Sequence, residues 1–187
     1  MLTLGIDPGT AITGYGLVRS EGDSQSLVDC GVVTTPSGLA LPQRLLILYD
    51  GLSALVANWR PDQAAVEQLF FSRNVRTALA VGHARGVVLL ALAKAQVPVA
   101  EYTPGEVKQA IVGYGRGRKE QIQEMVRIIL GLEAVPTPDD AADALALALC
   151  HAYSERTRRL LAAAAGNSAD RIGKRGDDSR SSGRPRG

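Results

Sequence analysis

The stretch Leu2-Thr3-Leu4-Gly5-Ile6-Asp7-Pro8-Gly9-Thr10 decides the fold and points to the chemistry of this chain. Residues 2–6 are mostly apolar, which is typical of a strand buried in a sheet. The run ends at Asp7, and the Pro-Gly pair that follows is a turn sequence. A carboxylate at the end of a buried strand is costly unless a cation meets it. This stretch therefore predicts a buried strand that carries a functional acid.

Outward from this strand, the sequence alternates between β-rich and helical segments. Four more strands are predicted, at Tyr15–Val18, Leu27–Thr35, Gln63–Val66 and Val97–Tyr102. Apolar spacings of three and four, together with capping signals, predict five helices. These helices span Leu41–Trp59, Asn74–Ala95, Pro104 to about Val112, a segment that ends at Leu130, and Asp140 towards Arg159. Three strands followed by alternating helices and strands predict an α/β fold, with a five-stranded mixed sheet covered by helices.

The composition is that of an ordinary globular protein. Of its 187 residues 45% are hydrophobic, and the formal net charge is only +2. Affinity for nucleic acid must therefore come from local clusters of charge. The longest apolar stretch, Val87–Ala93, is too short to span a bilayer, and no signal peptide is evident, so a cytoplasmic protein is expected.

The chain is expected to contain one folded domain and a tail. Residues 1–160 are long enough for a single domain with a hydrophobic core. Beyond about Ala165 the composition shifts to Gly, Ser, Asp and Arg. Such a segment buries too little apolar surface to offset its ordering entropy, so residues 166–187 are predicted to be a disordered, modestly basic tail.

Three more acids occupy places comparable to that of Asp7. Glu67 closes a second apolar run, while Asp140 and Asp143 are three residues apart at the start of a helix, on one face. Each acid alone has another explanation, as a turn former, a partner of the helix dipole or a surface charge. Together they predict a site of oxygen ligands for two Mg²⁺ or Mn²⁺ ions that supports phosphodiester hydrolysis. Asp139 is expected to point elsewhere and to cap the helix.

Several motifs follow one another in a fixed order along residues 1–155. They are Gly5-Ile6-Asp7-Pro8-Gly9-Thr10 with Gly14-Tyr15-Gly16, Ala65-Val66-Glu67-Gln68 with Phe70, Gly82-His83-Ala84-Arg85-Gly86, Val107-Lys108-Gln109, and Asp140-Ala141-Ala142-Asp143-Ala144-Leu145-Ala146. This ordered set resembles the RuvC family of bacterial Holliday-junction resolvases.

The resemblance implies a ribonuclease-H-like fold and a homodimer that nicks opposite strands of four-way DNA junctions during recombination and repair. It also implies dependence on Mg²⁺ and cooperation with the junction-binding and branch-migration proteins RuvA and RuvB. The motif positions place the catalytic, metal-binding acids of the family on Asp7, Glu67, Asp140 and Asp143.

Contacts with DNA are expected from basic and aromatic side chains. The candidates are Phe70, Arg73, Arg76, Lys108, Arg116, Arg118 and Lys119. The cations would meet phosphates, although a solvated basic loop is the alternative for residues 113–119. Phe70 would stack on or wedge between bases, or else pack in the core. The resemblance implicates Lys108 and Lys119 in DNA contact or catalysis.

Other interpretations stay open at this point. The small residues Ala78, Gly82 and Gly86 recur every four positions, so this stripe would admit a second copy of the chain or pack on its own sheet. The Asp-Pro-Gly-Thr sequence is also similar to the first phosphate loop of actin-like ATPases and sugar kinases, although that fold needs a second phosphate loop and a second domain. A junction-binding module without catalysis would not need four acids. A ribonuclease of the RNase H type would share the chemistry and differ only in substrate.

Overall fold

The structure is a computed structural model that describes residues 1–68, 75–115 and 117–177, with side chains for 1–68, 78–115 and 117–165. The chain divides into two compact units, Met1–Ala152 and Tyr153–Gly187. The first unit contains the whole sheet and all four predicted acids.

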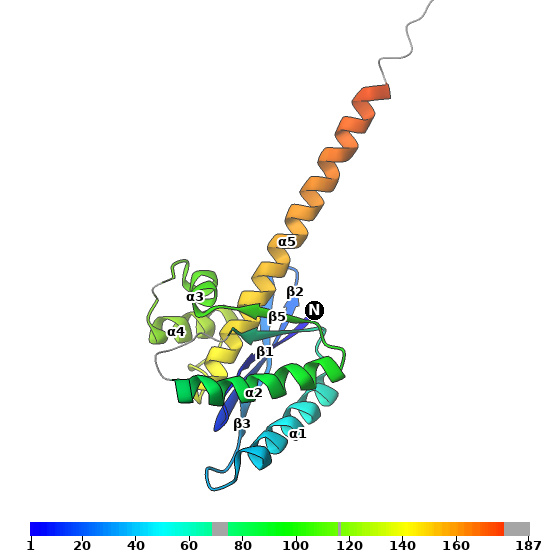
Figure 1. The fold of residues 1–187 in the computed structure, drawn as a ribbon. Helices are drawn as coiled ribbons and strands as arrows, with labels where there is room; N and C mark the ends of the chain where they lie inside the picture. Colours follow the sequence, from blue (N-terminus) through cyan, green and yellow to red (C-terminus); the bar gives the residue numbers. More distant parts are fainter. Residues whose placement is uncertain (69–74, 116, 178–187) are drawn as a thin grey trace, which may run out of the picture. The chain divides into compact units, whose positions relative to one another are not determined.

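The sheet has five strands and mixed direction, as predicted (Figure 1). Its strands are β1 (Leu2–Asp7), β2 (Ile12–Glu21), β3 (Ser24–Thr34), β4 (Gln63–Glu67) and β5 (Val99–Tyr102). The spatial order is β3-β2-β1-β4-β5. The pairs β1–β2 and β2–β3 are antiparallel, whereas β1–β4 and β4–β5 are parallel. Strand β1 is therefore central, and its carboxyl end lies beside that of β4.

Strand β2 is longer than the sequence predicted. It begins at Ile12 and so includes Gly14, and glycine lowers the strand propensity of an isolated segment. Hydrogen-bonded neighbours on both sides, β1 and β3, keep this glycine in the strand. Tertiary pairing thus overrides local propensity here.

The helices agree closely with the predicted segments over most of the chain. They are α1 (Leu41–Trp59), α2 (Val75–Lys94), α3 (Pro104–Val112), α4 (Lys119–Leu130) and α5 (Asp139–Asp177). The predicted capping box of α3 is present, because the Glu106 N–H donates to Thr103 Oγ1 and the Thr103 N–H donates to Glu106 Oε2. Gly113 and Gly131, both with positive φ, end α3 and α4.

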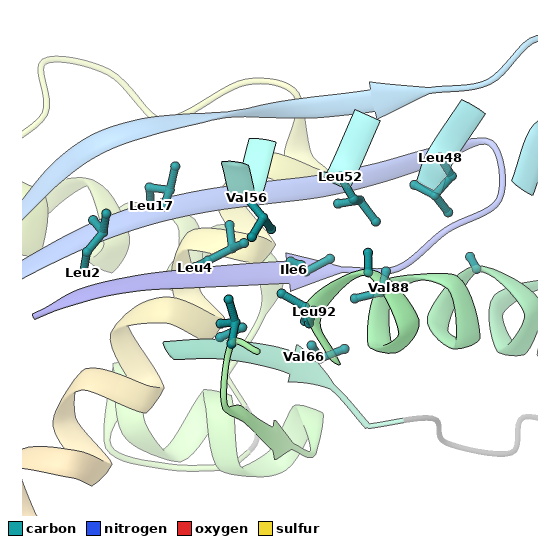
Figure 2. Packing of buried hydrophobic residues seen from close by; sticks show 14 residues of the cluster. Leu2, Leu4, Ile6, Leu17, Leu48, Leu52, Val56, Val66, Val88 and Leu92 are labelled. Carbon is teal, nitrogen blue, oxygen red and sulfur yellow. The ribbon is translucent and has the colours of Figure 1, made fainter. Parts of the chain in front are cut away.

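The main hydrophobic core lies between the sheet and the helices α1 and α2. Figure 2 shows Leu4, Ile6 and Val66 of the sheet among leucine and valine side chains of both helices. The helical members of this cluster include Leu48, Leu52, Val56, Ala84, Val88, Ala91 and Leu92. Because side chains alternate along a strand, this packing sends the residues next to Ile6 and Val66 to the opposite face.

The opposite face of the sheet carries the first part of α5, so helices cover both faces, as predicted. A Cβ atom at Gly5 would lie 1.9 Å from the carbonyl oxygen of Ala144, and one at Gly14 would lie 2.0 Å from that of Asp140. A Cβ at Gly16 would also lie within 3.0 Å of Leu145 atoms. These three glycines, the glycine floor, allow the backbone of α5 to approach β1 and β2 closely.

Helix α5 ends at Asp177 and not near Arg159, so the predicted end of this helix was wrong. The helix also runs through residues 166–177, which the sequence assigned to a disordered tail. Leu160–Ala165 consists of strong helix formers, and a helix propagates through hydrogen bonds within itself. Residues 178–187 lie outside the described residues, and the domain boundary near residue 160 stays a prediction. No helix in the described ranges has the length and apolar character needed to cross a membrane.

Candidate active site

Asp7 and Glu67 end two adjacent parallel strands. Ile6 of β1 pairs with Val66 of β4, so the following residues, Asp7 and Glu67, come side by side at the carboxyl ends of both strands. Since Ile6 and Val66 face the main core, the two acids face the side covered by α5. The expectation that parallel strands bring these acids to one edge agrees with the structure.

The glycine floor brings the acids of α5 to the same place. Gly14 pairs with Asp7 across β1 and β2, and the backbone of Asp140 lies directly over Gly14. Asp143 follows almost one helical turn later. The close approach of α5 to the sheet therefore carries Asp143 towards the acids at the strand ends.

These side chains enclose a cavity of about 240 Å³ within the first unit. Its charged lining consists of Asp7, Glu67, Asp143, Lys108 and Lys119, and its remaining wall is Pro104, Val107, Ile122, Ala146 and Leu147. Asp140 does not line this cavity, although its charge acts on Asp7. The structure thus brings together three of the four predicted acids and two of the predicted DNA-contacting lysines.

Lys119 is held by two carboxylates of α5. Its Nζ lies 3.0 Å from Asp143 Oδ2 and 3.2 Å from Asp139 Oδ2. Asp139 does not line the cavity, but it shares Lys119 with Asp143, because residues 139 and 143 are four apart and lie on the same side of the helix. The lysine holds the pKa of Asp139 below its usual range.

The cavity concentrates more negative charge than its lysines neutralise. The pKa of Asp7 is raised to about 7, first by burial and then by the nearby charges of Glu67, Asp143 and Asp140, against the opposing effect of Lys119. Burial, followed by the charge of Asp143, raises the pKa of Glu67. Burial also raises the pKa of Asp143, although its bond with Lys119 opposes this change. Such a cluster binds a cation readily.

The donor chemistry of this cluster fits a hard divalent cation. All its candidate ligand atoms are carboxylate oxygens, which Mg²⁺ and Mn²⁺ prefer. Within residues 1–68, 75–115 and 117–177, no three Asp, Glu, His or Cys side chains are already arranged around one point as metal ligands.

Of the other predicted DNA-contacting residues, only Arg118 has a described side chain, and it does not line the cavity. Arg118 is exposed just before α4, where its backbone N–H donates to Gln121 Oε1. Phe70, Arg73 and Arg116 lie outside the described residues, as does the side chain of Arg76.

One support of the site was missed by sequence reasoning. Arg44 of α1 donates from Nη2 to the Thr10 carbonyl at 2.9 Å and from Nε to Thr35 Oγ1 at 2.8 Å. Thr35 Oγ1 also donates to the Thr10 carbonyl. These bonds fix the turn that follows Asp7. No local pattern identifies Arg44, because its partners are 34 and 9 residues away in the chain.

A second missed feature is a polar network between α5 and the sheet. The hydroxyl of Tyr102 lies 2.8 Å from His151 Nδ1, and His151 Nε2 contacts Gln63 Oε1. If Tyr102 donates to Nδ1, the N–H of this histidine lies on Nε2 and donates to Gln63. The network joins α5 to β4 and β5 and does not line the cavity.

Comparison with known proteins identifies the family. Residues 3–151 match the family described as Crossover junction endodeoxyribonuclease RuvC. The chain is 60% identical over 157 residues to the protein of that name from Chloroflexus aggregans, covering 84% of this chain and 96% of the relative. It is 52% identical over 161 residues to that from Ruminiclostridium cellulolyticum, covering 86% and 97%.

The solved structures agree with this match. The structure titled "T. thermophilus RuvC in complex with Holliday junction substrate" superposes with a TM-score of 0.80 at 40% identity, covering 84% of this chain and 96% of that one. The yeast mitochondrial resolvase Ydc2, at 16% identity and a TM-score of 0.54, shares the fold, covering 79% and 77%. The predicted ribonuclease-H-like fold is thereby confirmed, and the chain belongs to the RuvC family of crossover junction endodeoxyribonucleases.

Proposed function

We propose that this chain resolves Holliday junctions by metal-dependent nicking of opposite DNA strands. One observation carries the proposal: Asp7, Glu67 and Asp143 share a cavity with Lys108 and Lys119 at the ends of two parallel strands. In a member of the RuvC family, this combination of acids and lysines suits the hydrolysis of a phosphodiester. The related protein from T. thermophilus is described in complex with a Holliday junction substrate.

Asp7, Glu67, Asp140 and Asp143 are proposed to hold the divalent cations, with Mg²⁺ as the natural ion and Mn²⁺ as a substitute. A bound pair of such ions activates a water molecule as nucleophile and stabilises charge on the leaving oxygen. The raised pKa of Asp7 and of Glu67 supports this assignment, because a bound cation would offset the burial and the neighbouring charges that raise it.

The lysines and the apolar wall have complementary roles in this proposal. Four acids near one point repel a DNA phosphate, and the ammonium groups of Lys108 and Lys119 offset this repulsion. Lys119 also orients Asp143 through their 3.0 Å contact. Val107, Ile122 and Leu147 limit access of bulk water, which strengthens electrostatic interactions inside the cavity.

Further DNA contacts are proposed around the cavity. Arg73, Arg76, Arg116 and Arg118 would bind phosphates on either side of the scissile bond, and Phe70 would stack on a base of the junction. These assignments rest on the sequence and on family membership.

The chain is further proposed to act as a homodimer through α2. On this helix Leu79, Gly86 and Leu90 lie on one side, at spacings of seven and four residues. The two leucines are 59% and 54% exposed, and a Cβ at Gly86 would meet no atom within 4 Å. Gly86 is therefore not needed for packing within the chain. A two-fold dimer would match the approximate two-fold symmetry of a four-way junction.

Cooperation with RuvA and RuvB, and action in the cytoplasm, are proposed from family membership alone. Both proposals assume that the enzyme acts on chromosomal DNA, at a junction that branch migration has already moved into position.

A comparison of substrates tests the proposed function. The protein is incubated with Mg²⁺ and a four-way junction, a linear duplex or an RNA–DNA hybrid of the same sequence. We expect paired symmetric nicks in the junction alone, no nicking in EDTA, and no nicking by the Glu67→Gln variant. Equal cleavage of the hybrid would identify a ribonuclease. Tight junction binding without nicks in Mg²⁺ or Mn²⁺ would identify a binding module.

A further inference from the structure

Arg85 of α2 links the catalytic end of β4 to the neighbouring strand. Its Nη2 lies 2.5 Å from Glu101 Oε2 of β5, and its Nε donates to the backbone carbonyl of Glu67 at 3.3 Å. Only 18% of the Arg85 side chain is exposed. One planar guanidinium thus contacts both the main chain at a proposed catalytic acid and a carboxylate on the adjacent strand.

Sheet geometry explains how Arg85 reaches both partners. Glu101 pairs with Val66 in the parallel β4–β5 ladder, so their side chains project from the same face. Val66 packs in the core beside α2, and its companions there include Ala84 and Val88, which flank Arg85 in the helix. The Glu101 carboxylate therefore emerges on the face from which Arg85 approaches. The Glu67 carboxylate projects from the other face, into the cavity.

The Glu67 carbonyl receives a hydrogen bond from Arg85 because the pairing of β4 with β1 ends just before it. The last pair between β1 and β4 is Ile6 with Val66. On the β1 side, Pro8 follows Asp7, and proline has no N–H to donate. On the β5 side, the Gln68 N–H donates to the Tyr102 carbonyl at 2.8 Å, which leaves the Glu67 carbonyl directed away from β5.

We propose that Arg85 is a positioning residue for Glu67. The carbonyl carbon of Glu67 is one bond from its Cα, so a donor that fixes the carbonyl also fixes the direction of the side chain. Glu101 in turn holds the guanidinium in place from the neighbouring strand. This inference rests on the proposed catalytic role of Glu67, and it gives a function to the Arg of the Gly-His-Ala-Arg-Gly motif that the catalytic assignment leaves unused.

Variants of the full-length protein test the link. Arg85→Gln removes both the positive charge and the planar guanidinium. Arg85→Lys keeps the charge but offers one nitrogen in place of two. Glu101→Gln leaves Arg85 intact and weakens only its ion pair with residue 101. Arg127 provides a matched control, because it also joins a carboxylate, Glu124, to a backbone carbonyl, that of Leu132, but far along α4. Three quantities are measured: single-turnover nicking of a four-way junction in saturating Mg²⁺, junction affinity in Ca²⁺, and Mn²⁺ affinity without DNA by electron paramagnetic resonance.

We expect Arg85→Gln to slow nicking by about 10- to 100-fold, the cost of a small misplacement of a catalytic group. Its Mn²⁺ affinity should fall several-fold, while junction affinity stays within about twofold of wild type. Arg85→Lys should also nick slowly, and Glu101→Gln should show a smaller loss. Arg127→Gln should nick at the wild-type rate, even if its melting temperature falls.

Distinct outcomes separate this inference from the proposed function. Wild-type nicking by Arg85→Gln, or an equal loss in Arg127→Gln, would overturn the positioning role of Arg85. If Arg85→Gln does not fold, Arg85→Lys and Glu101→Gln decide the question, and wild-type rates in both would overturn it. Full nicking by Glu67→Gln would overturn the catalytic role of Glu67 and this inference with it.

Discussion

Gly14→Ala is expected to disable the proposed active site without touching any of its ionisable groups. Gly14 lies on the glycine floor, opposite Asp7 in the β1–β2 ladder and beneath the backbone of Asp140. An added Cβ would lie 2.0 Å from the Asp140 carbonyl oxygen and 2.4 Å from its carbonyl carbon. Neither neighbour is a flexible side chain that could rotate away.

The required movement follows from these distances. Real Cβ atoms essentially never approach another heavy atom within 3.0 Å, so α5 and β2 must separate by at least 1.0 Å, the difference between 3.0 and 2.0 Å. A misplacement of about 1 Å costs roughly 100-fold in catalytic rate. Overpacking of this kind also lowers the free energy of unfolding by about 1–3 kcal/mol.

The assay is single-turnover nicking of a four-way junction, combined with urea unfolding and with junction binding in Ca²⁺. We expect a loss of about 100-fold in nicking with junction affinity retained. Gly38→Ala is the control, because a Cβ there meets nothing within 4 Å. Gly16→Ala should be milder, since its closest contacts include the movable side chain of Leu145. A stable Gly14→Ala protein that nicks at the wild-type rate would refute the role of the glycine floor.

Four more predictions follow from the site and the helices. Asp7→Asn should abolish nicking and preserve junction binding in a mobility-shift assay, whereas Asp139→Asn, which removes only a partner of Lys119, should reduce nicking far less; equal losses would contradict the assignment of the acids. In EDTA, the wild-type free energy of unfolding should fall as the pH rises from about 4 to about 7, since folded Asp7 (pKa about 7) keeps a proton that the unfolded chain (pKa 3.8) releases. Asp7→Asn should flatten this dependence in thermal melts, and an unchanged slope would mean that other groups cause it. Gly86→Leu should weaken dimerisation in sedimentation experiments and uncouple the two nicks of a cruciform, unless α2 lies outside the interface. Truncation after Ala165 should leave the melting temperature and nicking essentially intact, and loss of folding would place the domain boundary later.

Local patterns in the sequence were enough to predict most elements of this fold. The apolar run before Asp7, the helical spacing over Leu41–Trp59 and the capping box at Thr103 each depend on residues within a few positions of one another. The rule that parallel strands end at one edge then placed Asp7 beside Glu67. These features are determined by backbone geometry and local hydrogen bonding, which a single sequence displays directly.

Only the tertiary structure revealed how the site is completed. Asp139 shares Lys119 with Asp143, and Arg85 reaches from α2 to the ends of β4 and β5. The sequence around Gly14 indicates a turn or a strand. In the structure, the absence of a side chain at Gly14 allows the backbone of α5, more than a hundred residues later in the chain, to pack directly against β2. Such contacts join segments that are distant along the chain, and their distances depend on how closely the helices pack on the sheet. The sequence by itself therefore determined which residues are candidates for the chemistry, while packing decided which of them meet and what holds them in place.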